Sequence, residues 1–255
     1  GFEDKAAVLE MAHTNSTIQE RVQAWTSLPL TETVNDVSVG DANGNGWQEI
    51  VIASARGNVY SFEVTDTTLP QASLQASEAL GEFNIASPST IWTLKSGNLD
   101  GDSKPDLIAT DGTTAVAFKE DGTIIWNFTT PEGTVYALAV GDLDKNGVDD
   151  VFVGDGKGVV YAINGRFGTQ IWNFSSPTAT PIYFVQVGDL NGDGSIDVAA
   201  SGGTDGKIVY ALNSTNGVQL WNVTIARSVS GLAVGNLTGQ SHMDIVSVTM
   251  HMEGC

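Results

Sequence analysis

Acidic and amide side chains recur at alternate positions of four loops in this 255-residue chain. Loop 1 spans residues 41–49, loop 2 spans 98–106, loop 3 spans 142–150 and loop 4 spans 189–197, and a weaker copy, loop 5, spans 236–244. Positions 1, 3, 5 and 9 of loops 1 to 4 all carry oxygen-bearing side chains. Such side chains in a tightly turned loop converge on one point, and Ca²⁺ takes roughly six to eight oxygen ligands. The spacing therefore predicts a calcium site in each of these four loops.

The predicted ligands are the side chains at those four positions and the backbone carbonyl oxygen of position 7. Asp, Asn and Gly are also ordinary turn formers, so any single loop could be a plain hairpin, but four copies in register favour calcium. In loop 5, Asp244 is the only carboxylate, so we expect a weak or metal-free site there. We expect about four calcium ions, with these predicted ligands: Asp41, Asn43, Asn45, Trp47 and Glu49; Asn98, Asp100, Asp102, Lys104 and Asp106; Asp142, Asp144, Asn146, Val148 and Asp150; Asp189, Asn191, Asp193, Ser195 and Asp197.

The loops belong to a longer repeat. Their first residues are 57, 44, 47 and 47 residues apart, a period that suits a four-stranded propeller blade. Apolar, β-branched segments flank each loop, and segments such as GVVYAINGRFGTQIWNF add two more predicted strands joined by a tight turn. An aromatic residue recurs near the end of each unit, which indicates a packing position: Trp25, Phe83, Trp126, Trp172 and Trp221.

The two ends of the chain each contain half of this unit. Residues 6–26 resemble the third and fourth strands of a blade, and residues 229–250 resemble the first and second. Pairing the two halves would complete one more blade and hide the exposed sheet edges. The sequence thus predicts an all-β fold, a five-bladed β-propeller closed by pairing of its N- and C-terminal strands, with residues 1–255 as a single domain. The alternative is that the chain is part of a six- to eight-bladed propeller.

Charge and composition exclude several classes of protein. Thirty acidic residues against 11 basic ones give a net charge of −19, which repels nucleic acids and anionic lipids. No apolar run approaches the ~18 residues that span a bilayer, so we expect no membrane insertion in this segment. The single Cys255 excludes an internal disulfide framework. No nucleophile elbow, phosphate-binding loop or convergent catalytic set is evident, so we expect no catalytic residues and no enzymatic activity.

The loop segments GDLDKNGVDDVFVG and GDLNGDGSIDVAASG resemble FG-GAP/VCBS repeats, which are calcium-binding propeller units. The segments VVYAINGRFGTQIWNF and IVYALNSTNGVQLWNV resemble the blade strands of PQQ-type (quinoprotein-type) propellers. Together the two resemblances cover about residues 30–250. They imply calcium ligands at the loop positions given above and an extracellular binding or adhesion role. They do not imply quinone-dependent activity, because no cofactor-contacting residues are found.

Two further features bear on possible partners. Six residues before position 1, the innermost predicted strands of three successive blades carry Trp92, Tyr136 and Tyr183. These aromatic residues form either a partner platform around the central channel or packing between blades. Glycosylation is a second feature, because six N-x-S/T sequons supply candidate sites: Asn15, Asn127, Asn173, Asn213, Asn222 and Asn236.

These features predict an extracellular or cell-surface, calcium-stabilised β-propeller that acts as a non-catalytic binding, adhesion or surface-assembly module. The expected partner is a protein or glycan ligand at the cell surface, or further copies of the same chain. Two alternatives stay open. One is a carbohydrate-active or quinone-dependent propeller enzyme, and the other is a structural subunit of a surface layer or filament.

Overall fold

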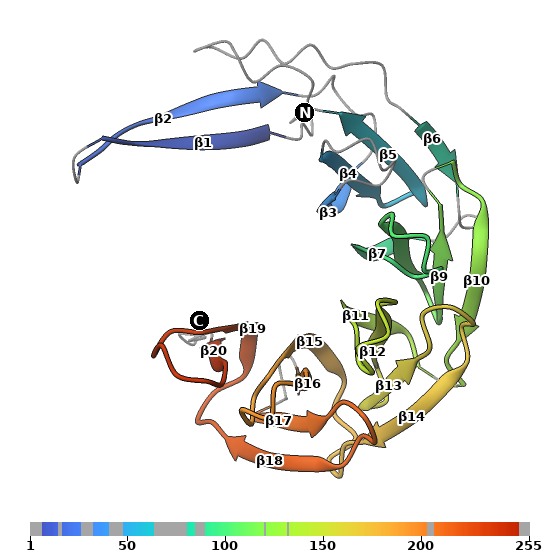
Figure 1. Ribbon diagram of the computed structural model, residues 1–255, viewed down its shortest axis with the longest axis vertical. Helices are drawn as coiled ribbons and strands as arrows, with labels where there is room; N and C mark the ends of the chain where they lie inside the picture. The colour runs from blue at the N-terminus through green and yellow to red at the C-terminus, as the bar shows by residue number, and fades with distance from the viewer. Residues whose placement is uncertain are drawn as a thin grey trace, which may run out of the picture.

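The computed structural model describes residues 7–14, 17–26, 33–40, 48–63, 81–84, 90–119, 121–131, 133–202 and 207–249. Within these ranges the chain forms β-strands and no helix, so none of the described segments is a helix that could cross a membrane. The strands follow one another around an open arc (Figure 1). They are β1 (Ala7–Thr14), β2 (Thr17–Thr26), β3 (Val34–Gly40), β4 (Glu49–Ser54), β5 (Asn58–Glu63), β6 (Gly81–Asn84), β7 (Ile91–Gly97), β8 (Asp106–Asp111), β9 (Thr114–Phe118), β10 (Ile124–Thr129), β11 (Val135–Gly141), β12 (Asp150–Asp155), β13 (Val159–Ile163), β14 (Gln170–Ser175), β15 (Ile182–Gly188), β16 (Asp197–Gly202), β17 (Ile208–Asn213), β18 (Gln219–Thr224), β19 (Val229–Gly235) and β20 (Asp244–Thr249).

Four sheets of four strands each form complete blades: β3–β6, β7–β10, β11–β14 and β15–β18. In every blade each strand pairs antiparallel with the next along the chain. The first strand of each blade lies on the inner side of the arc and the fourth on its outer side (Figure 1). The predicted all-β blade architecture is therefore confirmed, and each acidic loop joins the first strand of a sheet to the second.

The second strand of each complete blade is buried, and hydrophobic clusters pack each blade against the one that follows it. Strands β4, β12 and β16 are buried along their whole length, which explains why their sequences are continuous apolar runs rather than alternating ones. The hydrophobic clusters accordingly join neighbouring blades, as where Phe152 of β12 shares a cluster with Ile182 of β15. Packing between blades is thus the source of the core.

The recurrent tryptophan is a packing residue in two blades, as predicted. Trp126 and Trp172 are each only 8% exposed. The indole Nε1 of Trp126 donates a hydrogen bond of 2.5 Å to the carbonyl oxygen of Gly165, and that of Trp172 donates to the carbonyl oxygen of Ser214. Both acceptors lie in the hairpin between the third and fourth strands of the following blade. Each tryptophan therefore joins its own blade to the next one.

The predicted closure of the ring by pairing of the chain ends is not confirmed. Strands β1 and β2 form one two-stranded sheet and β19 and β20 form another, and no pairing joins the two. The two hairpins lie at opposite ends of the arc, separated by a gap (Figure 1). The architecture is thus four complete blades and two half-blades. Pairing within a hairpin is local in sequence, whereas closure needs strands separated by most of the chain, which carries a larger loop-closure entropy.

Candidate functional site

Loops 2, 3 and 4 lie at one end of the blades, directly after the inner strands β7, β11 and β15. Every predicted ligand of these three loops falls within the described part of the chain. In loop 1, Asp41, Asn43, Asn45 and Trp47 lie outside the described residues, and only Glu49, the first residue of β4, is placed and fully buried. The geometry of the candidate sites therefore comes from loops 2 to 4.

The loops are built from consecutive turns in which a side-chain oxygen accepts a backbone N–H two residues further on. In loop 4, Asn191 Oδ1 accepts from Asp193 N at 2.8 Å and Asp193 Oδ1 accepts from Ser195 N at 2.7 Å. The same two turns recur in loop 2, at 2.9 Å each, and in loop 3, at 3.2 and 2.7 Å. These bonds are the usual reason for Asp and Asn in turns. They fix one side-chain oxygen of each residue.

The tight path of each loop needs a left-handed backbone at position 4, where φ is 83° at Gly101, 60° at Lys145 and 80° at Gly192. Glycine adopts this conformation without a steric penalty, which explains its repetition there. Loop 3 reaches the same conformation with a lysine. The three loops therefore share one backbone shape, as the shared spacing predicts.

The residue at position 9 ends each loop, and it is also the first residue of the buried second strand. Asp106, Asp150 and Asp197 are at most 3% exposed. In loop 2, Asp106 Oδ2 accepts the backbone N–H groups of Leu99 and Asp100, each at 3.0 Å. The leucine at position 2 is buried and anchors the start of the loop. Its anchoring role was not predicted, although its recurrence as Leu99, Leu143 and Leu190 is a visible signal.

Burial and neighbouring negative charges disfavour the ionised form of the carboxyl groups at position 9. Burial, reinforced by neighbouring loop carboxylates, raises the pKa of Asp150 to about 6 and that of Asp197 to about 6. Burial also raises the pKa of Asp106. A carboxylate held away from water and beside other carboxylates favours either a proton or a bound cation. A divalent ion in these loops would relieve the repulsion directly.

Loop 4 contains a buried carboxylate oxygen whose hydrogen-bonding capacity is not satisfied by the protein. Asp197 Oδ2 accepts from Leu190 N at 3.1 Å, but its Oδ1 atom is buried and has no hydrogen-bond partner. A buried carboxylate oxygen without a partner is costly, and a bound cation would satisfy it. Among the described residues no three His, Cys, Asp or Glu side chains already stand together as a metal cluster. The loop would thus have to draw its oxygens together around an ion, with Asp189, Asn191 and Asp193 joining Asp197.

Loop 5 satisfies its acid without a cation. Asp244 Oδ2 accepts three hydrogen bonds of 3.0 Å, from Leu237 N, Thr238 N and Thr238 Oγ1. The hydrogen bonds from Leu237 and Thr238 lower the pKa of Asp244. The charged form is therefore stabilised by the protein itself, and a weak or metal-free loop 5 stays a prediction.

Hydrogen bonds between neighbouring blades link the loops to one another. The carbonyl oxygen of Asn98, at position 1 of loop 2, accepts from Asp149 N of loop 3 at 2.8 Å, and Asp189 of loop 4 accepts from Met243 N of loop 5 at 2.6 Å. Asp149 Oδ2 in turn accepts from Asn98 N at 2.9 Å. An ion that orders one loop would therefore also order its junction with the next blade.

The three predicted platform residues form a continuous aromatic row at the other end of the inner strands. The Tyr136 and Tyr183 rings are stacked with centroids 4.7 Å apart, and Trp92 meets Tyr136 edge to face at 6.3 Å. Trp92 remains 50% exposed and Tyr183 37% exposed. The row is compatible with both predicted roles, packing between blades and a partner platform. Its members pack on one another, and Trp92 and Tyr183 also stay accessible.

A β-bulge places each of these aromatic side chains. The register between the first and second strands skips Tyr136, which lies between the paired residues Val135 and Ala137. The same irregularity falls at Tyr183, and at Asn35 and Ser230 in two other blades. In β7 the register shift is longer and spans Trp92 and Thr93. Bulges redirect side chains away from the regular pleat. Nothing in the sequence spacing predicted the bulge itself.

The sequon asparagines are partly accessible. Asn127, Asn173, Asn222 and Asn236 are exposed, Asn213 is half-buried, and Asn15 lies outside the described residues. The first three occupy equivalent positions on the outer strands β10, β14 and β18, as expected when the preceding tryptophan points inward. Glycosylation of these sites stays a prediction.

Comparison with known proteins supports the fold assignment. The model of the lambda-carrageenase β-propeller domain matches residues 108–227, which is less than half of the chain. No curated protein matches. BBS1N, in its complex with ARL6DN, is similar in structure with a TM-score of 0.62 and 13% identity over 91% of this chain and 66% of that chain. Together with the four-stranded blades, these matches define the fold as a β-propeller.

Two further structures share the fold. Saccharomyces cerevisiae Sqt1 aligns with a TM-score of 0.60 and 11% identity, over 80% of this chain and 53% of that one. The V. cholerae biofilm matrix protein Bap1 aligns with a TM-score of 0.57 and 17% identity, over 80% of this chain and 31% of that one. Because this chain spans less than two thirds of each of these proteins, the similarity concerns the blades alone. The resemblance to FG-GAP/VCBS and PQQ-type repeats stays a prediction beyond its propeller part.

Proposed function

We propose that this chain is a calcium-stabilised β-propeller that acts outside the cell as a non-catalytic binding, adhesion or surface-assembly module. The observation that carries the calcium part is loop 4, where a buried carboxylate oxygen of Asp197 lacks a partner beside Asp189 and Asp193. Loop 3 offers a second set of carboxylates, Asp142, Asp144 and Asp150, although Asp150 Oδ1 already accepts from Gly165 N at 3.0 Å. Calcium bound there would neutralise the carboxylates and lock the junctions between blades.

The binding part of the proposal rests on the aromatic row. Trp92 and Tyr183 are exposed at the starts of the inner strands β7 and β15. Aromatic side chains of this kind are enriched in binding surfaces. A biofilm matrix protein and a propeller in complex with a protein partner share the fold. The net charge of −19 makes a neutral or cationic ligand more favourable than an anionic one.

Substitution of the row tests this proposal. We expect Trp92→Ala to weaken binding to a neutral polysaccharide or cell-surface preparation by about 30-fold, since truncating an aromatic binding residue typically costs about 2 kcal/mol. The matched control is Phe167→Ala, because Phe167 is also exposed but lies in the β13–β14 hairpin at the opposite end of the blade. Equal loss in both variants, or no loss in either, would contradict a platform at Trp92.

A carbohydrate-active enzyme is the second candidate, and the specific observation in its favour is the match to the propeller domain of a lambda-carrageenase. The same preparations decide between the two. Incubation with lambda-carrageenan and with neutral polysaccharides should release no reducing ends if the module is non-catalytic. Sustained release that depends on the protein would support the enzyme instead.

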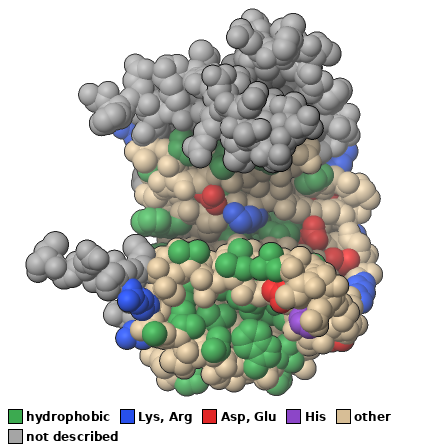
Figure 2. Space-filling view, turned by 90° about the vertical axis from the view of Figure 1, so that its left-hand side faces the viewer, with side chains coloured by type: hydrophobic (Ala, Val, Ile, Leu, Met, Phe, Trp, Pro, Cys, Tyr) green, Lys and Arg blue, Asp and Glu red, His purple; other side chains and the backbone are tan. Residues whose placement is uncertain are grey.

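We also propose that the β1–β2 hairpin completes the last blade and closes the ring at five blades. Trp221 is 39% exposed, whereas its equivalents Trp126 and Trp172 are buried against the outer hairpin of the next blade. Hydrophobic side chains gather on this end of the arc (Figure 2). Eight of them are exposed: Val218, Leu220, Trp221, Val223, Leu237, Met243, Val246 and Val248. An apolar surface of this extent usually marks an interaction site. Trp126 and Trp172 each contact the hairpin between the third and fourth strands of the next blade, and β1–β2 would supply that hairpin for Trp221.

The free energy of unfolding of Trp221→Ala tests closure. In a closed ring Trp221 is buried, so its truncation should cost about 3–5 kcal/mol, the same as Trp172→Ala. In an open arc the cost for Trp221 should stay near ~1 kcal/mol or below, while that for Trp172 is unchanged. Light scattering on the same samples should give a monomer mass. A mass that rises with concentration would show that the hairpin pairs with a second copy.

A further inference from the structure

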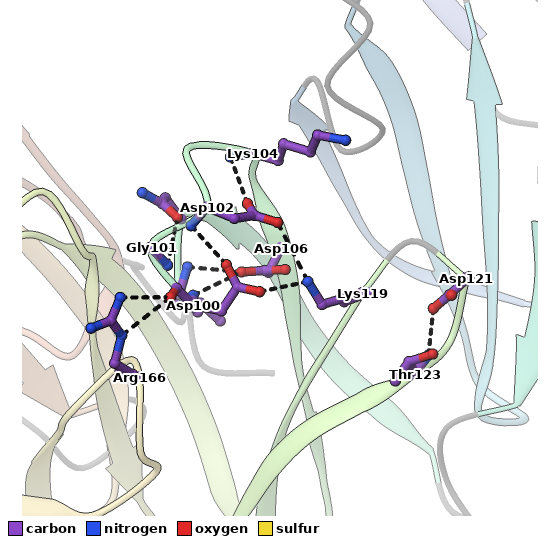
Figure 3. Close-up of polar contacts among 11 residues, drawn as sticks. Asp100, Gly101, Asp102, Lys104, Asp106, Lys119, Asp121, Thr123 and Arg166 are labelled. Atoms are coloured by element: carbon purple, nitrogen blue, oxygen red, sulfur yellow. Dashed lines mark hydrogen bonds and ion pairs between the residues drawn. The ribbon is translucent and has the colours of Figure 1, made fainter.

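Among the described loops, loop 2 differs from loops 3 and 4 in that a lysine forms salt bridges with its carboxylates. Lys119 Nζ lies 2.5 Å from Asp100 Oδ2 and 3.4 Å from Asp102 Oδ2. Figure 3 shows its side chain extending from the end of β9 toward the carboxylates at positions 3 and 5. The other oxygen of each carboxylate already accepts a backbone N–H within the loop. The ammonium thus contacts the two oxygens that the turn hydrogen bonds leave for a ligand.

The positions equivalent to Lys119 in the next two blades hold Asn164 and Asn213. Within the described part of the chain, these side chains form no hydrogen bond with the loop carboxylates. Asn164 Oδ1 accepts from Phe167 N at 3.1 Å and Asn213 Oδ1 accepts from Thr215 N at 3.1 Å, so both organise their own hairpins. The hairpin after Lys119 is shorter, closed by a bond of 2.8 Å from Lys119 N to Thr123 O. Among the described residues, no lysine or arginine forms a salt bridge with the carboxylates of loops 3 or 4.

A second basic side chain reinforces loop 2 from the neighbouring blade. The guanidinium of Arg166, in the β13–β14 hairpin, donates to the backbone carbonyl oxygen of Asp100 through Nε at 3.2 Å and through a terminal nitrogen at 3.1 Å (Figure 3). Loop 2 has three carboxylates, one fewer than loop 3, and it meets two basic groups.

We infer that loop 2 is filled by the Lys119 ammonium and takes no calcium at concentrations that saturate loops 3 and 4. A calcium ion would need the same Asp100 and Asp102 oxygens and would meet the repulsion of the ammonium at close range. Loop 2 is then a calcium-independent junction, and the ring holds one ion fewer than its loop sequences indicate. This inference rests on the proposed calcium binding of the other loops.

Native mass spectrometry of the full chain, titrated with calcium alone, tests the inference by counting bound ions. We expect Lys119→Gln to bind one more calcium ion than the unsubstituted protein, with an affinity at least 10-fold above that of the unsubstituted loop 2. The matched control is Lys157→Gln, which removes the same charge from an exposed residue in the β12–β13 turn, at the other end of the blades from the loops. This control should leave the count unchanged.

A second variant keeps the test decisive if Lys119→Gln folds poorly. Asp102→Asn in the unsubstituted background should leave the calcium count unchanged, because that carboxylate faces an ammonium rather than an ion. A loss of one ion in Asp102→Asn, or equal non-zero counts in Lys119→Gln and the unsubstituted protein, would overturn the inference. Absence of bound calcium in every variant would instead refute the proposed function.

Discussion

Removing calcium with a chelator should lower the melting temperature of this protein by roughly 10 to 20 °C. A ligand that binds only the folded state at about 100 times its dissociation constant contributes about 2.7 kcal/mol. Two ions, in loops 3 and 4, would contribute about twice that. For a chain of this length each kcal/mol moves the midpoint by roughly 2–4 °C. Differential scanning calorimetry in millimolar calcium and in excess chelator measures the difference.

Magnesium provides the control for this prediction. Mg²⁺ prefers a near-octahedral site that keeps several waters, so the same concentration of magnesium should restore only a small part of the loss. Identical midpoints in calcium, magnesium and chelator would mean that the Asx turns and the core alone hold the blades. In that case the loops would be turns and nothing more.

Replacing Asp197 by asparagine should remove the stabilisation from one ion, which is about half of that expected from loops 3 and 4. The carboxylate is buried, its pKa is raised to about 6, and Oδ1 has no partner in the described network. In calcium we expect Asp197→Asn to lose roughly 5 to 10 °C, because one ion is no longer bound. In chelator the loss should be much smaller, because a neutral amide is less costly to bury than an unpaired carboxylate. The readout is the calcium-minus-chelator difference in midpoint.

Asp244→Asn is the matched comparison, because Asp244 occupies the same position in loop 5. Its oxygen accepts three hydrogen bonds, so the substitution should destabilise the fold by about 1 kcal/mol. That cost should be the same with and without calcium. If Asp244→Asn reduced the calcium-dependent part as much as Asp197→Asn does, the distinction between the loops would be wrong.

The blade architecture could be predicted from the sequence because the signals are local. Each loop has the same spacing of Asp, Asn and Gly, and each flanking strand has the β-branched, apolar composition of a buried strand. Position 9 was predicted as a ligand, and the structure places Asp106, Asp150 and Asp197 at the start of the second strand with their carboxylates turned toward the loop. Repetition made these assignments possible, since one copy alone would have been an ordinary turn.

Features that depend on contacts between blades could not be predicted in the same way. The salt bridge of Lys119 could not be predicted, because only the folded blade brings it to Asp100. The bulge at Tyr136 arises from strand register, which spacing does not report. Asp36 accepts hydrogen bonds from Leu94 N at 2.8 Å and Thr93 Oγ1 at 2.9 Å in the next blade, a contact that no local pattern indicates. Pairing of the chain ends likewise depends on contacts between distant segments, and it stays a prediction.

A crystal structure grown in calcium, with anomalous scattering to locate the ion, tests the central claim most directly. We predict an anomalous peak in loop 4, coordinated by oxygens of Asp189, Asn191, Asp193 and Asp197 and by the Ser195 carbonyl at ~2.3–2.6 Å. An equivalent peak should lie in loop 3. Water or no density between these side chains at millimolar calcium would contradict the account.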